Sequence, residues 1–180
     1  MSSGCELRKK MYDQPKFEPL EKTDFFGDAR SARPRIEGTV ARGHLNEDEG
    51  FFTGKLDGKY LTELPEQLEL TQEFLDRGQE RYDINCSVCH GYTGYGNGMV
   101  VQRGFKQPTS YHDDRLVGSD LGYFYEVMTK GFGVMSSYSY QVKPEDRWAI
   151  AAYIRTLQVS QRASLSDLSD QDAPAASEAH

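Results

Sequence analysis

Three stretches of the chain show a helical pattern of apolar and polar positions. Residues 70–82 place apolar side chains among charged ones at a helical spacing, which predicts an amphipathic helix. Residues 119–131 begin with Ser and Asp and end with Lys and Gly, the residue types that start and stop helices. Residues 144–157 begin with Pro followed by two acids, which favour a helix start. We predict an all-α fold whose last helix packs across the first, with small alanines permitting close approach.

The two flanks of this helical region lack such a period. Residues 1–66 hold scattered prolines, and their aromatic side chains are spaced among charges. A segment of this composition buries too little apolar surface to form a core of its own. Residues 160–180 are rich in Ser, Asp, Gln and Ala. We therefore predict an extended N-terminal arm over 1–66, a folded domain over 67–159 and a disordered tail over 160–180.

The net charge of -7 is unevenly distributed. Residues 86–143 carry five basic and four acidic side chains, whereas both flanks are acidic. This balance argues against nucleic acid as a partner. A near-neutral, aromatic-rich surface suits contact within a protein complex better than long-range steering. No run of eighteen apolar residues occurs in the sequence, so it encodes no transmembrane helix.

The candidate chemistry centres on Cys86, Cys89 and His90. Two thiols three positions apart, followed at once by an imidazole, match covalent haem attachment, in which each thiol adds to one vinyl group and the imidazole ligates the iron. A structural zinc site needs four Cys or His ligands, but the remaining cysteine is Cys5 and the other histidines are scattered singly. A dithiol oxidoreductase would place the pair after a buried strand, whereas here the pair follows the helix predicted over residues 70–82. We predict one covalently bound haem c and, as the leading hypothesis, electron transfer.

Met135 is the predicted sixth ligand of the iron. It lies in a Gly-rich loop between two predicted helices, where glycines let the backbone come close to the porphyrin. Met99 and, as a bis-imidazole alternative, His112 remain open. Met128 falls inside a predicted helix, where packing in the core is the default. A thioether ligand stabilises ferrous iron and raises the reduction potential, whereas a second imidazole lowers it.

The order of these features resembles a known family. A helix, Cys-x-x-Cys-His, a Gly-rich loop, a Met loop and a closing helix with Arg147-Trp148-Ala149-Ile150 resemble a class I monohaem cytochrome c over about half of the chain. More narrowly, residues 11–16, 31–34 and 38–43 resemble the arm of the monohaem cytochrome subunit of alternative complex III, a bacterial quinol-oxidising respiratory assembly. One departure is Ser136, where the family often has Pro after the ligand Met, so a looser loop is expected here.

The resemblance implies that the chain carries electrons and contributes no catalytic residue. Electrons from quinol would reach its haem through a larger subunit and leave to a soluble cytochrome or a terminal oxidase. The arm would contact the other subunits of the membrane complex. Several aromatic side chains would line or shield the haem, namely Tyr92, Tyr95, Phe105, Tyr111, Phe132 and Tyr138.

Cys5 suggests a membrane anchor. Ser3-Gly4-Cys5 resembles the end of a bacterial lipobox, where the cysteine becomes the acylated N-terminus, although Ser2 stands where Leu is usual. Dual acylation suffices for stable anchoring; an unmodified thiol is the alternative. We expect the chain on the periplasmic side of a bacterial membrane, held by lipidated Cys5 or by partner subunits, with an export signal that lies upstream of Met1 or is supplied in another way.

Two other functions remain open at this stage. A free-standing periplasmic electron shuttle would not need the long arm. A haem enzyme or gas sensor would have an open sixth position and would bind carbon monoxide readily in its ferrous form.

Overall fold

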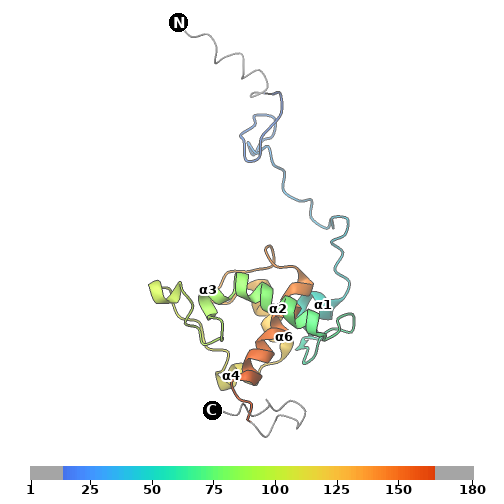
Figure 1. Cartoon of the computed structure of the whole chain (residues 1–180). Helices are drawn as coiled ribbons and strands as arrows, with labels where there is room; N and C mark the ends of the chain where they lie inside the picture. Colours follow the sequence, from blue (N-terminus) through green and yellow to red (C-terminus); the bar gives the residue numbers. More distant parts are fainter. Residues whose placement is uncertain (1–13, 165–180) are drawn as a thin grey trace. The chain divides into compact units, whose positions relative to one another are not determined.

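The computed structural model describes residues 14–164, and the chain divides into two compact units, one ending at Leu45 and one beginning at Asn46 (Figure 1). All helices and strands in the described part belong to the second unit. In chain order they are α1 (Glu49–Thr53), β1 (Lys55–Leu56), β2 (Lys59–Tyr60), α2 (Gln72–Asn85), α3 (Ser87–His90), the 3₁₀ helix η2 (Val101–Arg103), α4 (Asp114–Val117), α5 (Leu121–Lys130) and α6 (Pro144–Ser160). The two strands pair antiparallel, with Lys55 opposite Tyr60 and Leu56 opposite Lys59.

The described part of the first unit, residues 14–45, is held by local hydrogen bonds. Lys22 and Arg30 form an antiparallel bridge, and the Ser31 hydroxyl donates to the Glu21 carbonyl at 2.6 Å. Large apolar side chains of this unit stay exposed instead of forming a core, namely Phe17, Leu20, Phe25, Ile36, Val40 and Leu45.

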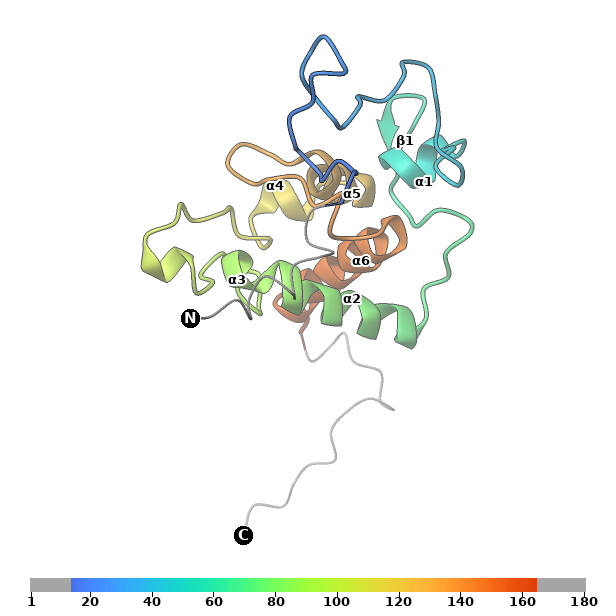
Figure 2. The ribbon, with the colours of Figure 1, turned by 90° about the horizontal axis from the view of Figure 1, so that it is seen from above.

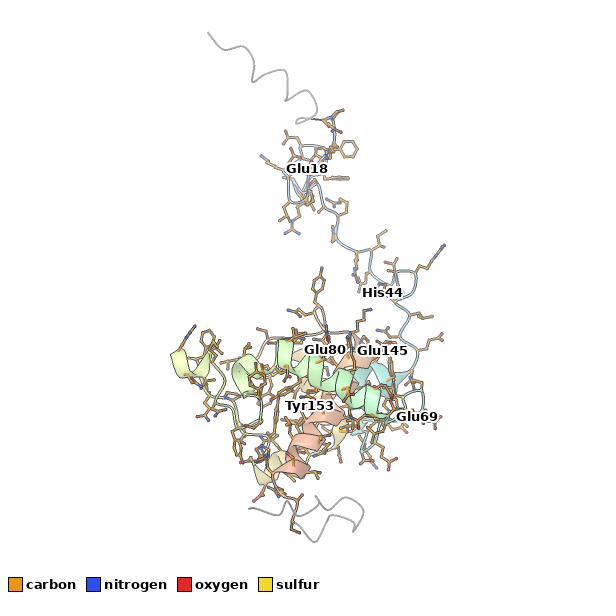
Figure 3. All side chains as sticks on the ribbon, viewed as in Figure 1. Glu18, His44, Glu69, Glu80, Glu145 and Tyr153 are labelled. Atoms are coloured by element: carbon orange, nitrogen blue, oxygen red, sulfur yellow. The ribbon has the colours of Figure 1, made fainter. Side chains whose placement is uncertain are left out.

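The core of the second unit forms where α6 crosses α2, as both views show (Figures 1 and 2). Gly78 of α2 lies so close to α6 that a Cβ there would stand 2.3 Å from the Ala149 carbonyl oxygen. The ring of Tyr153, labelled on α6 in Figure 3, packs on Tyr82 with centroids 5.3 Å apart. Arg77 donates to Asp146 at 2.7 Å at the edge of this crossing. The predicted close packing of the first and last helices is confirmed, with a glycine on α2 making the approach possible.

Local residues mark one end each of α2, α5 and α6. The Thr71 side chain caps α2 by accepting from the Phe74 amide at 3.1 Å. The helix α5 ends at Lys130, and Gly131 follows with a positive φ of 82°, which favours glycine. Pro144 lies in the first turn of α6, where backbone N–H groups have no acceptor within the helix, so the N–H that proline lacks costs no hydrogen bond. The mostly helical fold, with one two-stranded sheet among the described residues, agrees with the predicted fold class.

The compact unit begins earlier than the sequence pattern predicts. The sequence pattern predicts that residues 46–66 belong to the extended arm, yet they pack against the helices. The Asp48 side chain caps α1, Phe51 is buried, and the buried Trp148 indole N–H donates to the Phe51 carbonyl at 2.9 Å. This segment has no helical period because its turns are short and its anchoring contacts come from α5 and α6, far along the chain.

The chain ends lie outside the described residues, and with them the predicted lipid anchor at Cys5 and all but the first residues of the predicted tail. Among residues 14–164, no helix has the length and apolar character needed to cross a membrane.

Candidate haem-binding site

The turn from α2 into α3 gathers the three motif side chains. The Cys86 amide donates to the Tyr82 carbonyl at 2.8 Å and the His90 amide donates to the Cys86 carbonyl at 2.9 Å, so helical geometry continues through the motif. Residues three and four apart share one helix face. Cys86, Cys89 and His90 therefore project from one side of α3, with Cys86 buried, Cys89 half-buried and both thiols free.

Two hydrogen bonds and a glycine fix the end of this motif. The buried Tyr82 hydroxyl donates to the Gly91 carbonyl at 2.7 Å, and the Ser87 hydroxyl donates to the Asp83 carbonyl at 2.6 Å. Gly91 has φ 74°, and a Cβ there would stand 2.4 Å from the Asn97 side-chain oxygen. The chain therefore turns sharply after His90 only because a glycine follows it.

His90 has the environment of a neutral metal ligand. Its ring stacks on the buried Tyr111 ring, with centroids 4.6 Å apart and planes 8° apart. Burial lowers the pKa of His90 to about 4, so the imidazole is neutral at pH 7, the form that binds metal ions. Its buried Nδ1 has no hydrogen-bond partner within residues 14–164.

A largely apolar cavity opens beside His90. Its wall comes from α3, the segment 106–111, α4, α5, the loop after α5 and one residue of α6. The lining residues are His90, Lys106, Gln107, Pro108, Thr109, Tyr111, Arg115, Leu116, Tyr123, Phe124, Val127, Met128, Phe132, Gly133, Val134, Met135 and Ile154. Two lining residues of this cavity, Lys106 and Arg115, carry a positive charge, and His90 is neutral.

Met135 reaches this cavity on a tight loop. Phe132 and Met135 exchange two backbone hydrogen bonds of 3.0 and 2.9 Å. A Cβ on Gly131 would stand 2.5 Å from the Met135 carbonyl oxygen, so the loop closes only over a glycine. The absence of a proline at Ser136 does not prevent this closure, because the paired backbone replaces it.

The other ligand candidates lie in different surroundings. Met128 lines the same cavity from α5 but is buried in the core. Met99 is 60% exposed and lies outside the cavity wall. The His112 ring nitrogen Nε2 pairs with the Thr93 carbonyl at 2.7 Å, and His112 is not part of the wall. The structure thus brings Met135, rather than Met99 or His112, to the cavity of His90, while its ligation of iron stays a prediction.

The aromatic residues expected around the haem divide into two groups. Tyr111 and Phe132 line the cavity, and Tyr138 packs against the core. Tyr92, Tyr95 and Phe105 are exposed and lie outside the cavity wall. The sequence pattern did not predict Lys106 and Arg115, because Lys106 lies on an irregular segment and Arg115 on the four-residue helix α4, and neither is long enough to show a periodic face toward the cavity.

These residues fit haem c. The two thiols suit thioether bonds to vinyl groups, and an imidazole and a thioether are axial ligands of c-type haem iron. An apolar wall suits the porphyrin, and the cations of Lys106 and Arg115 suit its two carboxylates. Within the described part of the chain, no group of three or more His, Cys, Asp or Glu side chains is placed to hold a metal ion.

Comparison with known proteins bears on the same segment. Residues 73–154 match the family described as cytochrome c oxidase, cbb3-type, subunit III. A chain of the reducing HAO-like protein complex of Kuenenia stuttgartiensis is 23% identical, with a TM-score of 0.45; the match covers 61% of the present chain and 54% of that one, about half of its length. No curated protein matches the chain. The matched segment holds the complete Cys86–His90 motif, and its likeness to this family implies a covalently bound haem c.

Proposed function

We propose that this chain is the monohaem electron-transfer subunit of a membrane complex that oxidises quinol, as in alternative complex III, and that it passes electrons to a soluble cytochrome or a terminal oxidase. The observation that carries the proposal is the joint presence of His90 and Met135 in the wall of one apolar cavity, with His90 directly following Cys89 of the motif. Haem iron gains and loses one electron by cycling between its ferric and ferrous states.

Each side chain has a holding role in this scheme. Cys86 and Cys89 attach the porphyrin, and His90 and Met135 ligate its iron. Tyr111 fixes the plane of the His90 ring by stacking on it. The apolar wall excludes water from the haem site. This lowers the reorganisation energy of the solvent when the charge of the haem changes. None of these roles moves a proton, so the chain itself contributes no acid–base catalyst.

Membership of a larger complex is supported by the first unit. Residues 14–45 expose six large apolar side chains, each more than half accessible, and such side chains are typical anchors in protein interfaces. We place the chain on the periplasmic side of a bacterial membrane, held by these contacts and by lipidated Cys5. A purified subunit whose intact mass equals that of the unmodified Cys5 chain plus haem would end the lipid proposal.

The ligand set is tested by spectroscopy of variants of the haem-loaded protein. Replacing Met135 with Ala should abolish the near-infrared sulfur-to-iron band of the oxidised protein and give a high-spin ferric spectrum. Met99→Ala is the matched control and should keep the band. If Met135→Ala keeps the band and Met99→Ala loses it, the assignment is wrong. A low-spin ferric spectrum that is lost only in His112→Ala would indicate a bis-imidazole iron instead.

The place in a complex is tested on solubilised membranes of the native host. Tagged full-length chain should co-purify with partners that reduce its haem when a quinol is added. Deletion of residues 14–45 should leave the haem spectrum intact and remove this co-purification. A chain that purifies alone with a dispensable arm would be a free shuttle, and rapid binding of carbon monoxide to the ferrous form would indicate an open sixth site.

A further inference from the structure

A second apolar groove, separate from the haem cavity, lies between the segment that precedes α2 and the helix α6. Its volume is about 560 Å³, and no residue of its wall lines the haem cavity. Its apolar wall consists of five leucines and one valine, namely Leu64, Leu68, Leu70, Leu75, Leu121 and Val159. We call it the leucine groove.

One wall of the leucine groove is an irregular segment that turns hold in place (Figure 2, teal to green between β2 and α2). The Leu68 amide donates to the Pro65 carbonyl at 2.9 Å, and the Thr71 amide donates to the Glu69 carbonyl at 3.1 Å. The apolar edge of the groove nevertheless stays open to solvent, because Leu70 is 62% exposed. Exposed apolar side chains gathered along a groove are typical of interaction sites.

The border of the leucine groove is acidic. Residues 62–76 hold five acidic side chains and no basic one. Glu63 lies in the wall, and Glu66 and Glu69 are exposed between its leucines (Glu69 is labelled in Figure 3). Within residues 14–164 these three carboxylates form no ion pair. Their negative charge is therefore available to a partner.

Arg155 also lies in the wall of the leucine groove, but its hydrogen bonds serve the fold. Its guanidinium donates to the Val117 carbonyl at 3.0 Å, to the Ser119 carbonyl and to the Gln158 side-chain oxygen at 2.7 Å. These bonds direct the cation to backbone and amide oxygens of its own domain. The exposed part of the groove thus keeps an apolar floor with an acidic border.

We propose that the leucine groove is a docking surface for a partner subunit, which places a basic amphipathic helix in it; this rests on the membership of a larger complex proposed above. An amphipathic helix binds an apolar groove by laying its apolar face into it. Lys or Arg side chains flanking that face would meet Glu63, Glu66 and Glu69, and such opposite charges fix the orientation of a complex.

The charge of the border disfavours the other occupants of an apolar groove. Residues 165–180 hold four acidic side chains and no Lys or Arg, so this end of the chain would be repelled. A second copy docked symmetrically would place the same acidic border against itself, and like charges brought together across an interface cost binding energy. An anionic lipid surface would be repelled in the same way. A basic protein segment is the occupant that these charges favour.

The test is isothermal titration calorimetry of the haem-loaded full-length chain with a model peptide. The peptide consists of two copies of Leu-Lys-Lys-Leu-Leu-Lys-Leu, which place leucines on one face of a helix and lysines on the other. It should bind in a saturable way, and its affinity should fall as ionic strength rises from about 20 mM to about 200 mM. The same peptide with Glu in place of each Lys should not bind.

Variants separate the charge of the groove from its apolar floor. Glu66→Lys with Glu69→Lys should weaken binding about tenfold at low salt and reverse the effect of salt. Leu70→Ser with Val159→Ser should weaken binding about tenfold at every ionic strength, since both side chains are groove residues that reach solvent. In solubilised membranes of the native host, both double variants should lose co-purification with partner subunits.

Matched double variants elsewhere in the chain control for charge and apolar content. Asp24→Lys with Glu37→Lys makes the same change of net charge at two exposed positions. Leu56→Ser with Val40→Ser removes the same two residue types, which are 55% and 58% exposed there. Both controls should bind the peptide as the wild type does. The haem spectrum and the far-ultraviolet circular dichroism of all four double variants should equal those of the wild type.

Three results would overturn the proposal. The first is a pair of groove variants that bind the peptide and co-purify with partners as the controls do. The second is tighter peptide binding after deletion of residues 1–13, which hold Arg8, Lys9 and Lys10, because the groove would then be filled by the chain itself. The third is a dimer in sedimentation equilibrium that only the groove variants lose. A wild-type chain that purifies alone would count against the larger complex, whereas co-purification that is independent of the groove counts against the docking surface alone.

Discussion

The crossing of α2 and α6 depends on the missing side chain of Gly78. An added Cβ would stand 2.3 Å from the oxygen and 2.7 Å from the carbon of the Ala149 carbonyl, and 3.1 Å from the Tyr153 Cβ. The first two are backbone atoms that cannot rotate away, so the helices must separate by about 1 Å to reach ordinary contact. Such overpacking costs about 3 kcal/mol at the upper end of its usual range. The higher helix propensity of Ala compared with Gly offsets about 1 kcal/mol of this cost.

We therefore expect Gly78→Ala to lower the free energy of unfolding by about 2 kcal/mol and the melting temperature by about 8 °C. The measurement is urea and thermal unfolding of the haem-loaded protein, followed by far-ultraviolet circular dichroism. Gly118→Ala is the matched control, because its Cβ would lie 3.4 Å from the Asp114 carbonyl oxygen in ordinary contact. It should lose no stability. A Gly78→Ala protein as stable as Gly118→Ala would refute the account of the crossing.

Two further predictions concern contacts that join distant segments. Burial alone would raise the pKa of Glu126, but hydrogen bonds from Lys130, Lys55 and Tyr60 outweigh it and hold this pKa at about 2. The carboxylate therefore stabilises the fold above its unfolded pKa of 4.5, and this stability is lost as pH falls toward 2. Glu126→Gln should lower the free energy of unfolding by about 1–2 kcal/mol at pH 7, measured by urea unfolding. The difference in stability between this variant and the wild type should shrink between pH 4.5 and 2. An equal difference at pH 7 and pH 3 would contradict this reasoning. Trp148→Phe removes the hydrogen bond to the Phe51 carbonyl and should lower the free energy of unfolding by about 2 kcal/mol. Amide hydrogen exchange should rise first in residues 49–60. Unchanged exchange in these residues would show that this bond does not anchor the segment.

The sequence predicted the parts of the fold that are specified locally. The helices α2, α5 and α6 have periodic apolar faces and a local end signal each, at Thr71, Gly131 and Pro144, and the structure places them within two or three residues of the expected bounds. The Cys86–His90 motif is likewise local, since a single helical turn sets the relation of its side chains. Such features need no knowledge of what packs against them.

The features that escaped prediction depend on contacts between distant residues. The segment 46–66 joins the core through Trp148 and through a tight backbone approach, in which a Cβ on Gly122 would stand 2.0 Å from the Gly54 carbonyl oxygen. Neither glycine indicates its partner in the sequence, because glycine serves both in turns and where two backbones approach closely. The cations of the cavity wall escaped for the same reason.

The early start of the compact unit changes what the first segment can do. With residues 46–66 packed in the second unit, the segment that we propose to contact partner subunits ends at Leu45 rather than at residue 66. The Leu61 amide donates to the Gly54 carbonyl at 3.0 Å, and the Gly122 amide donates to the Leu61 carbonyl at 2.8 Å. These bonds tie the hairpin region to the start of α5, the helix whose far end leads into the Met135 loop. The hairpin region and the start of α5 are therefore fixed to each other by bonds within the second unit, and these bonds involve no residue of 14–45.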